Sequence, residues 1–272
     1  MPKSGQYTDA PVAETTPPTT LADPLAEALR LIGLADAQGA MLRLMGGLAF
    51  HAQAPEWKAG VERERRDIDL ATTSRDRKAV AELLASNGYV PDRQYNALYG
   101  HKQLYFVDPS RNRPVDVLVD RLEMCHSFEF ADRIAIDRPT LPLAELLLSK
   151  LQVVKLNRKD VLDALILLAE HPLTPDDTGI NTARITALTS TDWGWWRTVT
   201  GNLDRLLAFL ESEIGASDLD TGRPNRYEPA AQVRALRAAI DAGPKSTRWR
   251  LRSRIGDKVS WYEEPEEVGH GR

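Results

Sequence analysis

The sequence predicts an α/β fold in its first half and an α-helical second half. Residues 103–107 and 115–119 are strand candidates, and Val115, Val117 and Val119 would form one buried face of the second. From Pro139 onward, apolar residues instead recur three and four positions apart, as they do in amphipathic helices. The chain has 272 residues, of which 42% are hydrophobic, so it is long enough to bury a substantial core.

The first half begins with a segment, residues 1–20, that is rich in Pro, Thr and small residues and is expected to be a disordered tail. Pro24 suits the first turn of a short helix. The turn-forming residues 108–114 predict that the strands 103–107 and 115–119 pair as a β-hairpin. The other elements expected here are a helix at 21–34, an apolar run at 41–45, a helix at 48–53, a strand at 67–72 and a helix at 78–87 capped by Ser74 or Asp76.

The second half contains five segments with helical spacing, at 143–156, 160–169, 182–188, 192–214 and 229–242. The strand pattern gives way to this helical pattern near residues 132–141. We therefore expect four parts: the tail 1–20, an α/β domain 21–135, a helical domain 136–244, and a segment 245–272 that is first basic and then acidic.

Composition excludes several classes of protein. The net charge of -4 shows that the whole molecule is not a basic nucleic-acid binder, so a polynucleotide would need a local patch. Cys125 is the only cysteine, which rules out an internal disulfide and makes a thiolate metal cluster unexpected. The five histidines lack the spacing of zinc ligands. Without a long apolar run or a secretory signal, we expect a cytoplasmic protein with no membrane partner.

Three aspartates form the most informative pattern. Asp67 and Asp69 are two positions apart in a predicted strand, so their side chains share one face, roughly 7 Å apart. Asp116 lies in the strand 115–119, on the face opposite Val115 and Val117. If the two strands are neighbours, the three carboxylates can hold Mg²⁺, or Mn²⁺, in a two-metal site that stabilises the attacking and leaving oxygens of a displacement.

Gly46 and Gly47 follow the apolar run 41–45 and precede a predicted helix. Because glycine has no Cβ atom, a phosphate can approach the backbone there, and the N-terminus of the helix offers unpaired N–H groups to it. A plain tight turn is the alternative interpretation.

The order Gly-Gly, Asp-x-Asp and a strand with one Asp resembles the DNA polymerase β-like nucleotidyltransferase superfamily. The segments 143–150 (LAELLLSK) and 159–163 (KDVLD) resemble the AbiEii-type toxins. The resemblance covers roughly residues 40–170 and implies a nucleotidyltransferase fold with a mixed sheet. It also implies that Lys150 and Asp160 complete the site, with Lys155 as the competing lysine. The chain departs from the family in Leu48, where many relatives have Ser or Thr, and in the 19 residues between Gly47 and Asp67, where residues 55–64 must loop out.

The resemblance implies transfer of a nucleoside monophosphate from an NTP to an acceptor hydroxyl. The acceptor is expected to be RNA, such as the 3′ end of tRNA, and the protein to be a toxin of a toxin–antitoxin system with a cognate antitoxin. One alternative is transfer to a small molecule or a protein side chain. Another is a catalytically inactive protein that keeps the fold and binds nucleotide or RNA.

Two further clusters lie in the second half. Trp193, Trp195 and Trp196 are expected to belong to the core, with a base-stacking platform as the alternative. The segment 245–258 alternates basic and other residues, which predicts an edge strand or extended arm with one basic face. Such a face would suit an RNA backbone, although a solvated surface segment fits equally well. Its four arginines are Arg248, Arg250, Arg252 and Arg254.

Overall fold

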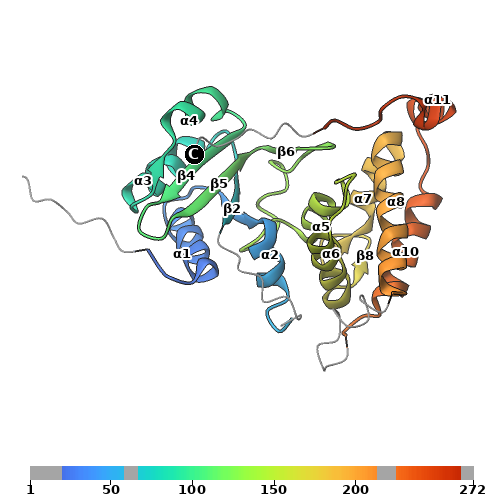
Figure 1. Cartoon of the computed structure of the whole chain (residues 1–272), viewed down its shortest axis with the longest axis horizontal. Helices are drawn as coiled ribbons and strands as arrows, with labels where there is room; N and C mark the ends of the chain where they lie inside the picture. Colours follow the sequence, from blue (N-terminus) through green and yellow to red (C-terminus); the bar gives the residue numbers. More distant parts are fainter. Residues whose placement is uncertain (1–19, 58–66, 213–224, 265–272) are drawn as a thin grey trace, which may run out of the picture.

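The computed structural model describes residues 20–57, 67–212 and 225–264. Its first half is built on a five-stranded mixed sheet in the order β1-β2-β5-β4-β3. Figure 1 shows β2, β5 and β4 of this sheet. β2 and β5 run parallel, whereas each of the other neighbouring pairs is antiparallel. The predicted α/β class and the β4–β5 hairpin are therefore confirmed. The strands are β1 (Leu42–Met45), β2 (Ile68–Thr72), β3 (Val90–Pro91), β4 (Gln103–Asp108) and β5 (Arg113–Val119).

Four helices accompany this sheet, and two of them, α1 and α4, begin at a side-chain cap, whereas neither Ser74 nor Asp76 caps α3 through its side chain. Asp23 accepts a hydrogen bond from the Ala26 amide and starts α1, with Pro24 as its first residue. Asp92 caps α4 in the same way, a helix that the hydrophobic pattern did not reveal. The helices are α1 (Pro24–Ala37), α2 (Gly46–Gln53), α3 (Arg77–Ser86) and α4 (Arg93–Tyr99).

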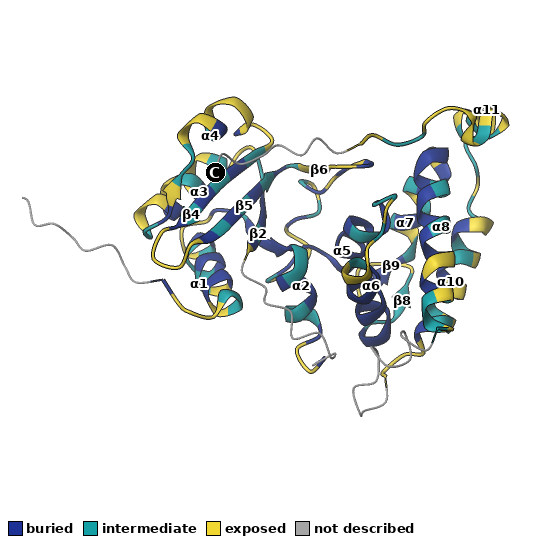
Figure 2. Cartoon of the chain, viewed as in Figure 1, coloured by how far each residue is buried: buried dark blue, intermediate teal, exposed yellow. Residues whose placement is uncertain are grey.

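The second half is helical, as expected. α10 packs against α8, α7 and α6, and α2 from the first half packs against α5 and α6. Figure 2 shows that the buried residues of both halves face one another in the interior, and they belong to one continuous apolar core. The helices are α5 (Leu143–Leu151), α6 (Arg158–Glu170), α7 (Thr182–Thr191), α8 (Trp193–Leu210) and α10 (Pro229–Ala242), with two short strands, β8 (Leu173–Thr174) and β9 (Ile180–Asn181), between α6 and α7.

Several expectations need correction. The helix expected over 143–156 ends at Leu151, because the next helix has its own N-cap, Asn157, and needs a turn before it. The prediction that the basic segment 245–258 forms an edge strand or extended arm is wrong. The segment forms α11 (Thr247–Ile255), capped by Ser246, followed by the 3-10 turn η1 (Gly256–Lys258). Thr20 was placed in a disordered tail, yet it is buried and its hydroxyl bonds Asp108 at 2.6 Å.

Other expectations fall on residues that the structure does not describe. These are the disorder of residues 1–19, most of the loop 55–64, the end of the helix expected to reach residue 214, and the acidic residues after Glu264. Trp193 and Trp195 are each 5% exposed, which confirms that they belong to the core, and Cys125 is a buried free thiol. Within the described ranges, no helix combines the length and apolarity needed to cross a bilayer.

The hairpin of β6 (Arg121–Glu123) and β7 (Ser127–Glu129) connects the sheet to the helices. At its turn, the His126 ring lies 5.0 Å from the Trp195 ring, and its Nε2 atom lies 2.8 Å from the Thr198 hydroxyl. Burial lowers the pKa of His126 to about 4, and the negative charge of Asp192 offsets only part of this effect. The imidazole is therefore neutral in the folded protein at neutral pH.

This neutral histidine predicts a pH-dependent stability. The unfolded chain takes up a proton on His126 below pH 6.5, whereas the folded chain does so only near pH 4. Stability that is present above pH 6.5 is thus lost as the pH falls through this window, by up to about 3 kcal/mol. We expect the difference in unfolding free energy between the wild type and His126→Gln to shrink from pH 7 to pH 4 in urea titrations. A difference that stays constant over this range would contradict the assignment.

Candidate active site

Two aspartates lie side by side at the centre of the sheet. Because β2 and β5 are parallel and in register, Asp69 is directly opposite Asp116, on strands about 4.8 Å apart. Val115 and Val117 alternate with Asp116 and point into the core, so the carboxylates share the other face. Both aspartates are half-buried and line a cavity of about 520 Å³.

Gly46 makes room for one of these carboxylates. It is the first residue of α2 and has a φ of +61°, a conformation that glycine adopts without strain. A Cβ atom at this position would lie 2.6 Å from Cγ of Asp69. The space that the missing Cβ leaves is thus filled by the Asp69 side chain. Gly47, next in the helix, is half-buried and does not line the cavity.

Gln103 fixes the orientation of the other carboxylate. Its side-chain amide donates a hydrogen bond of 2.5 Å to Oδ1 of Asp116. Gln103 is paired with Leu118 in the β4–β5 ladder, and Leu118 lies two positions after Asp116 on the same face. Sequence reasoning missed this residue, although the register of the predicted hairpin would have placed it beside Asp116.

Asp67 precedes β2 and is exposed outside the cavity lining. The structure therefore does not bring it to the cavity wall with Asp69 and Asp116. Tyr105 is paired with Asp116 in the β4–β5 ladder, and burial raises the pKa of this tyrosine, as do the negative charges of Asp116 and Asp67. No three His, Cys, Asp or Glu side chains in the described part of the chain are grouped closely enough to form a ready-made metal cluster.

Lys150 faces the aspartate pair from the helical half. Its ammonium group lies 2.8 Å from Oδ1 of Asp160, 3.1 Å from Oδ2 of Asp163 and 5.3 Å from the centre of the Phe50 ring. Burial by itself lowers the pKa of Lys150, but the two carboxylates outweigh it and the pKa is raised above its usual value. Lys150 is thus a fixed positive charge. Lys155, the competing lysine, is exposed after the end of α5 and does not line the cavity.

The cavity lies between the sheet and the segment that runs from the end of α5 to the start of α6. The structure brings five of the expected site residues to its wall: Gly46, Asp69, Asp116, Lys150 and Asp160. Its other lining residues, which sequence reasoning did not single out, include Gln103, Ser149 and Asn157. Arg248 and Arg252 line a different cavity, and Arg250 and Arg254 line neither. The arrangement offers carboxylates on one wall and an ammonium group on the other, as a bound polyphosphate with its cations requires.

No family model and no curated protein sequence matches the chain. The solved structures that match the chain include the following two. An antigenic nucleotidyltransferase-like protein from Paracoccidioides brasiliensis is 14% identical, with a TM-score of 0.36, over 85% of this chain and 97% of that one. The STING-associated CdnE c-di-GMP synthase from Capnocytophaga granulosa is 14% identical, with a TM-score of 0.27, over 85% of this chain and 81% of that one. These likenesses are too distant to assign an activity.

The crowding at Gly46 can be measured with a matched pair of glycines. Gly46→Ala forces a Cβ atom into the Asp69 carboxylate, whereas Gly39, with φ +71°, has open space around it. Gly39→Ala is expected to cost about 1 to 2 kcal/mol for the left-handed backbone alone. Gly46→Ala should lower the unfolding free energy by about 2 kcal/mol more than Gly39→Ala, because the Asp69 side chain must also shift. Equal losses of unfolding free energy in the two variants would show that Asp69 does not need this space.

The Lys150 ion pairs generate a second stability prediction. Lys150→Met leaves Asp160 and Asp163 without their cation, and Asp163 is only 3% exposed. Breaking such a buried pair costs about 3 kcal/mol, measured as the free energy of unfolding at pH 7. Adding Asp163→Asn should restore part of this loss, because it removes the uncompensated buried charge. If the changes in unfolding free energy of the two single variants add up to that of the double variant, Lys150 and Asp163 are not coupled.

Proposed function

We propose that the chain is a nucleotidyltransferase that moves a nucleoside monophosphate from an NTP to an acceptor hydroxyl. The observation that carries the proposal is the pairing of Asp69 with Asp116 on the cavity face, with Gly46 shaped around the first carboxylate. This is the arrangement that the resemblance to the DNA polymerase β-like superfamily implies. Lys150 and Asp160 from the helical half lie on the same cavity, where the AbiEii-type resemblance expects them.

The donor set suits Mg²⁺ or Mn²⁺. Asp69 and Asp116 offer carboxylate oxygens from adjacent strands, and Asp67 lies nearby on the exposed side. Two neighbouring carboxylates on one face repel each other, which a divalent cation relieves. When bound there, the metal supplies charge neutralisation to the triphosphate and to the attacking and leaving oxygens.

The protein side chains have distinct roles in the transfer. The acceptor oxygen forms a bond to the α-phosphorus as the bond to the bridging oxygen breaks, and pyrophosphate leaves. Asp116, oriented by Gln103, accepts the proton of the acceptor hydroxyl. Lys150 neutralises the charge that develops on the phosphates, and its pairs with Asp160 and Asp163 hold it in place before the substrate arrives.

RNA, such as the 3′ end of tRNA, is the acceptor that we propose, and the protein would then act as the toxin of a toxin–antitoxin pair. The AbiEii-like segments 143–150 and 159–163 support this choice, and they form α5 and the start of α6 beside the cavity. The basic helix α11 offers a local positive patch on an otherwise acidic chain.

Asp69→Asn and Asp116→Asn are expected to reduce transfer by on the order of 10²-fold or more. Both should leave the unfolding free energy largely unchanged, because Asn has nearly the same size and shape as Asp. Asp132→Asn, at an exposed turn before α5, removes the same charge away from the cavity and is the matched control. The assay follows label from each of the four α-labelled NTPs, with Mg²⁺ or Mn²⁺, in the presence of total RNA.

The destination of the label decides between the candidates. Label on RNA supports the proposal. Label on protein or on a small molecule would show that this other class of molecule, and not RNA, is the acceptor. If the wild type transfers no label to any of these, or if Asp69→Asn turns over at the wild-type rate, the assignment of the site is wrong.

A further inference from the structure

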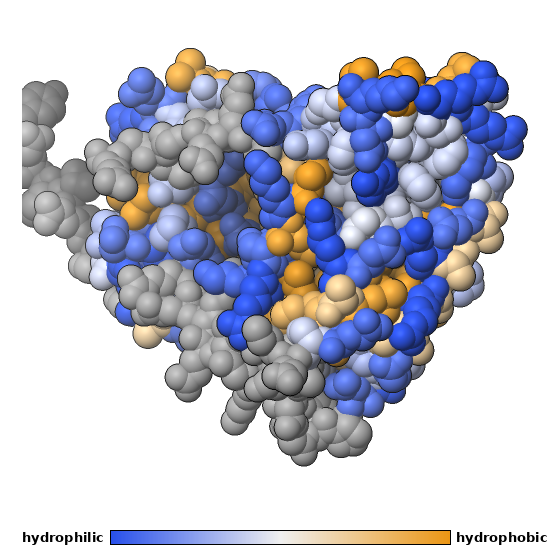
Figure 3. Space-filling model, turned by 45° about the vertical axis from the view of Figure 1, so that its right-hand side comes forward, coloured by the Kyte–Doolittle hydropathy of each residue, from blue (hydrophilic) through white to orange (hydrophobic). Residues whose placement is uncertain are grey.

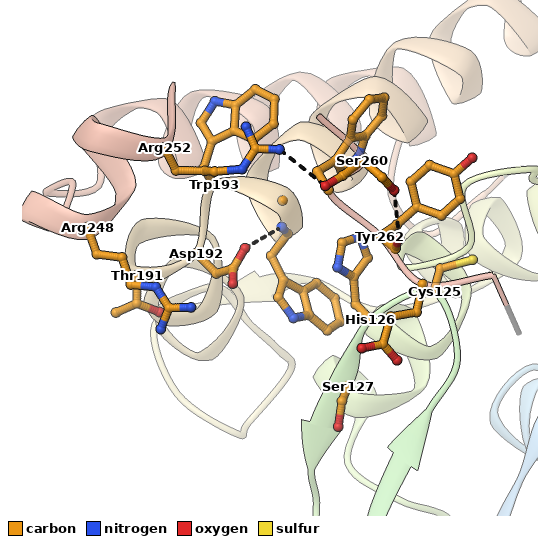
Figure 4. Close-up of a pocket in the computed structure, with 14 residues that line it drawn as sticks. Cys125, His126, Ser127, Thr191, Asp192, Trp193, Arg248, Arg252, Ser260 and Tyr262 are labelled. Atoms are coloured by element: carbon orange, nitrogen blue, oxygen red, sulfur yellow. Dashed lines mark hydrogen bonds between the residues drawn. The ribbon is translucent and has the colours of Figure 1, made fainter. Parts of the chain in front are cut away.

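A second cavity, of about 480 Å³, lies under α11 and beside the N-terminal end of α8. Figure 4 shows Arg248 and Arg252 on one side of this cavity and Cys125 and His126 on the other. We call it the α11 pocket. Nothing in the proposed transfer chemistry uses it, yet its walls carry two arginines and the aromatic rings that the lining of the site cavity lacks.

α11 is strongly basic on a chain whose net charge is -4. Residues 245–258 contain six basic residues and one acid, Asp257. The arginines of α11 lie on different faces of the helix. Arg248 and Arg252 are four positions apart and line the pocket, whereas Arg250 is rotated about 200° around the helix axis from Arg248. Figure 3 shows strongly polar surface mixed with apolar surface at the upper right, the region of α11 in Figure 1.

The two pocket arginines differ in how they are held. The guanidinium carbon of Arg252 lies 4.6 Å from the centre of the Trp193 ring, and its nitrogens donate to the carbonyls of Gly256 and Val259. Arg248 is exposed and makes no hydrogen bond or ion pair with any residue that the structure describes. Arg252 is therefore part of the wall, and Arg248 is the cation available to an anionic ligand.

The rest of the lining is aromatic and polar. Trp261 and Tyr262 contribute half-buried rings, Trp193 and Trp195 belong to the buried core beside the pocket, and Thr191 contributes a hydroxyl. Two acids also line the pocket, Asp192 and Glu263. The Asp192 carboxylate already accepts the Trp195 amide at 3.1 Å as the cap of α8. The combination of a free arginine and a wall of rings suits a nucleotide, with its phosphate on the cation and its base against the rings.

The α11 pocket is connected to the site cavity along the surface. Met124 lines the site cavity, while the residues that follow it, Cys125, His126 and Ser127, line the α11 pocket. A third cavity, of about 400 Å³, shares Met124 with the site cavity and Glu263 with the α11 pocket. Tyr99, Lys102 and Arg121 line this intermediate cavity. Three cavities thus follow one another from α11 to the aspartate pair, which suits a polymer better than a small molecule.

We infer that the α11 pocket binds one nucleotide of a single-stranded RNA whose 3′ end reaches the site cavity, with Arg248 on the phosphate. This inference rests on the proposed function in naming RNA. A duplex keeps its bases stacked and paired, so only a single strand can place a base against the pocket wall. The C-terminal helix is then an acceptor-binding element.

The test measures binding of a 5′-fluorescein-labelled 12-nucleotide single-stranded RNA by anisotropy, without NTP or divalent ions. Arg248→Gln is expected to weaken binding about fivefold or more at 100 mM salt and to lower the slope of log K against log salt by about one. Arg250→Gln removes the same charge from the same helix but outside the pocket, and should change affinity less than about twofold. Equal thermal stability of the two variants excludes unfolding as the cause.

Each other outcome has a defined meaning. Equal losses in both variants, or no loss in either, overturn the inference, because the pocket would then contribute nothing specific. Preference for a 12-base-pair RNA duplex overturns it as well. So does binding to anionic lipid vesicles without binding to RNA, since Leu251, Ile255 and Val259 are exposed on this segment. RNA binding that depends on Arg248 without label transfer would instead reject the proposed function alone.

Discussion

The parallel pairing of β2 with β5 is the constraint on which the site depends. It brings two carboxylates to neighbouring positions on one face, where like charges repel. The surrounding structure compensates for this arrangement with a hydrogen bond from Gln103 to Asp116 and with a glycine that leaves space for Asp69. A divalent cation bound between these two residues, as the proposed function requires, would relieve the repulsion further.

The helical half supplies the opposite charge and fixes its position. Lys150 comes from α5, and its two partners, Asp160 and Asp163, come from α6. A second buried network holds the same helix: Glu145 is fully buried and accepts hydrogen bonds from Arg133 and Arg184. Because α5 is tied at both ends and α2 packs against it, the ammonium group is held at a set position on the cavity wall across from the sheet. This rigidity is what preorganised electrostatic stabilisation requires.

In the proposed function, chemistry and acceptor binding occupy different cavities. Three acids and Lys150 line the site cavity, which suits metal ions better than a bare polyanion. The arginines of the α11 pocket lie in the C-terminal segment, which returns to the sheet half where the Glu263 amide donates a hydrogen bond to the Cys125 carbonyl. The two cavities are close together, because the consecutive residues Met124 and Cys125 line one each.

The sequence by itself determined the fold class, most helices with clear apolar periodicity and the face of Asp116, because these follow from local patterns. It also indicated Gly46, Gly47, Asp67, Asp69 and Asp116, and the family resemblance added Lys150 and Asp160. Gly47 and Asp67 do not line the cavity. Only the tertiary structure decided that β2 and β5 are neighbours, that Gln103 holds Asp116, and that Lys150 rather than Lys155 faces the cavity. Alternating arginines predicted a strand, yet α11 is a helix because the Ser246 cap and the packing of Arg252 on Trp193 outweigh a two-residue pattern. Contacts between residues distant in sequence are set by packing and register, which no local pattern contains.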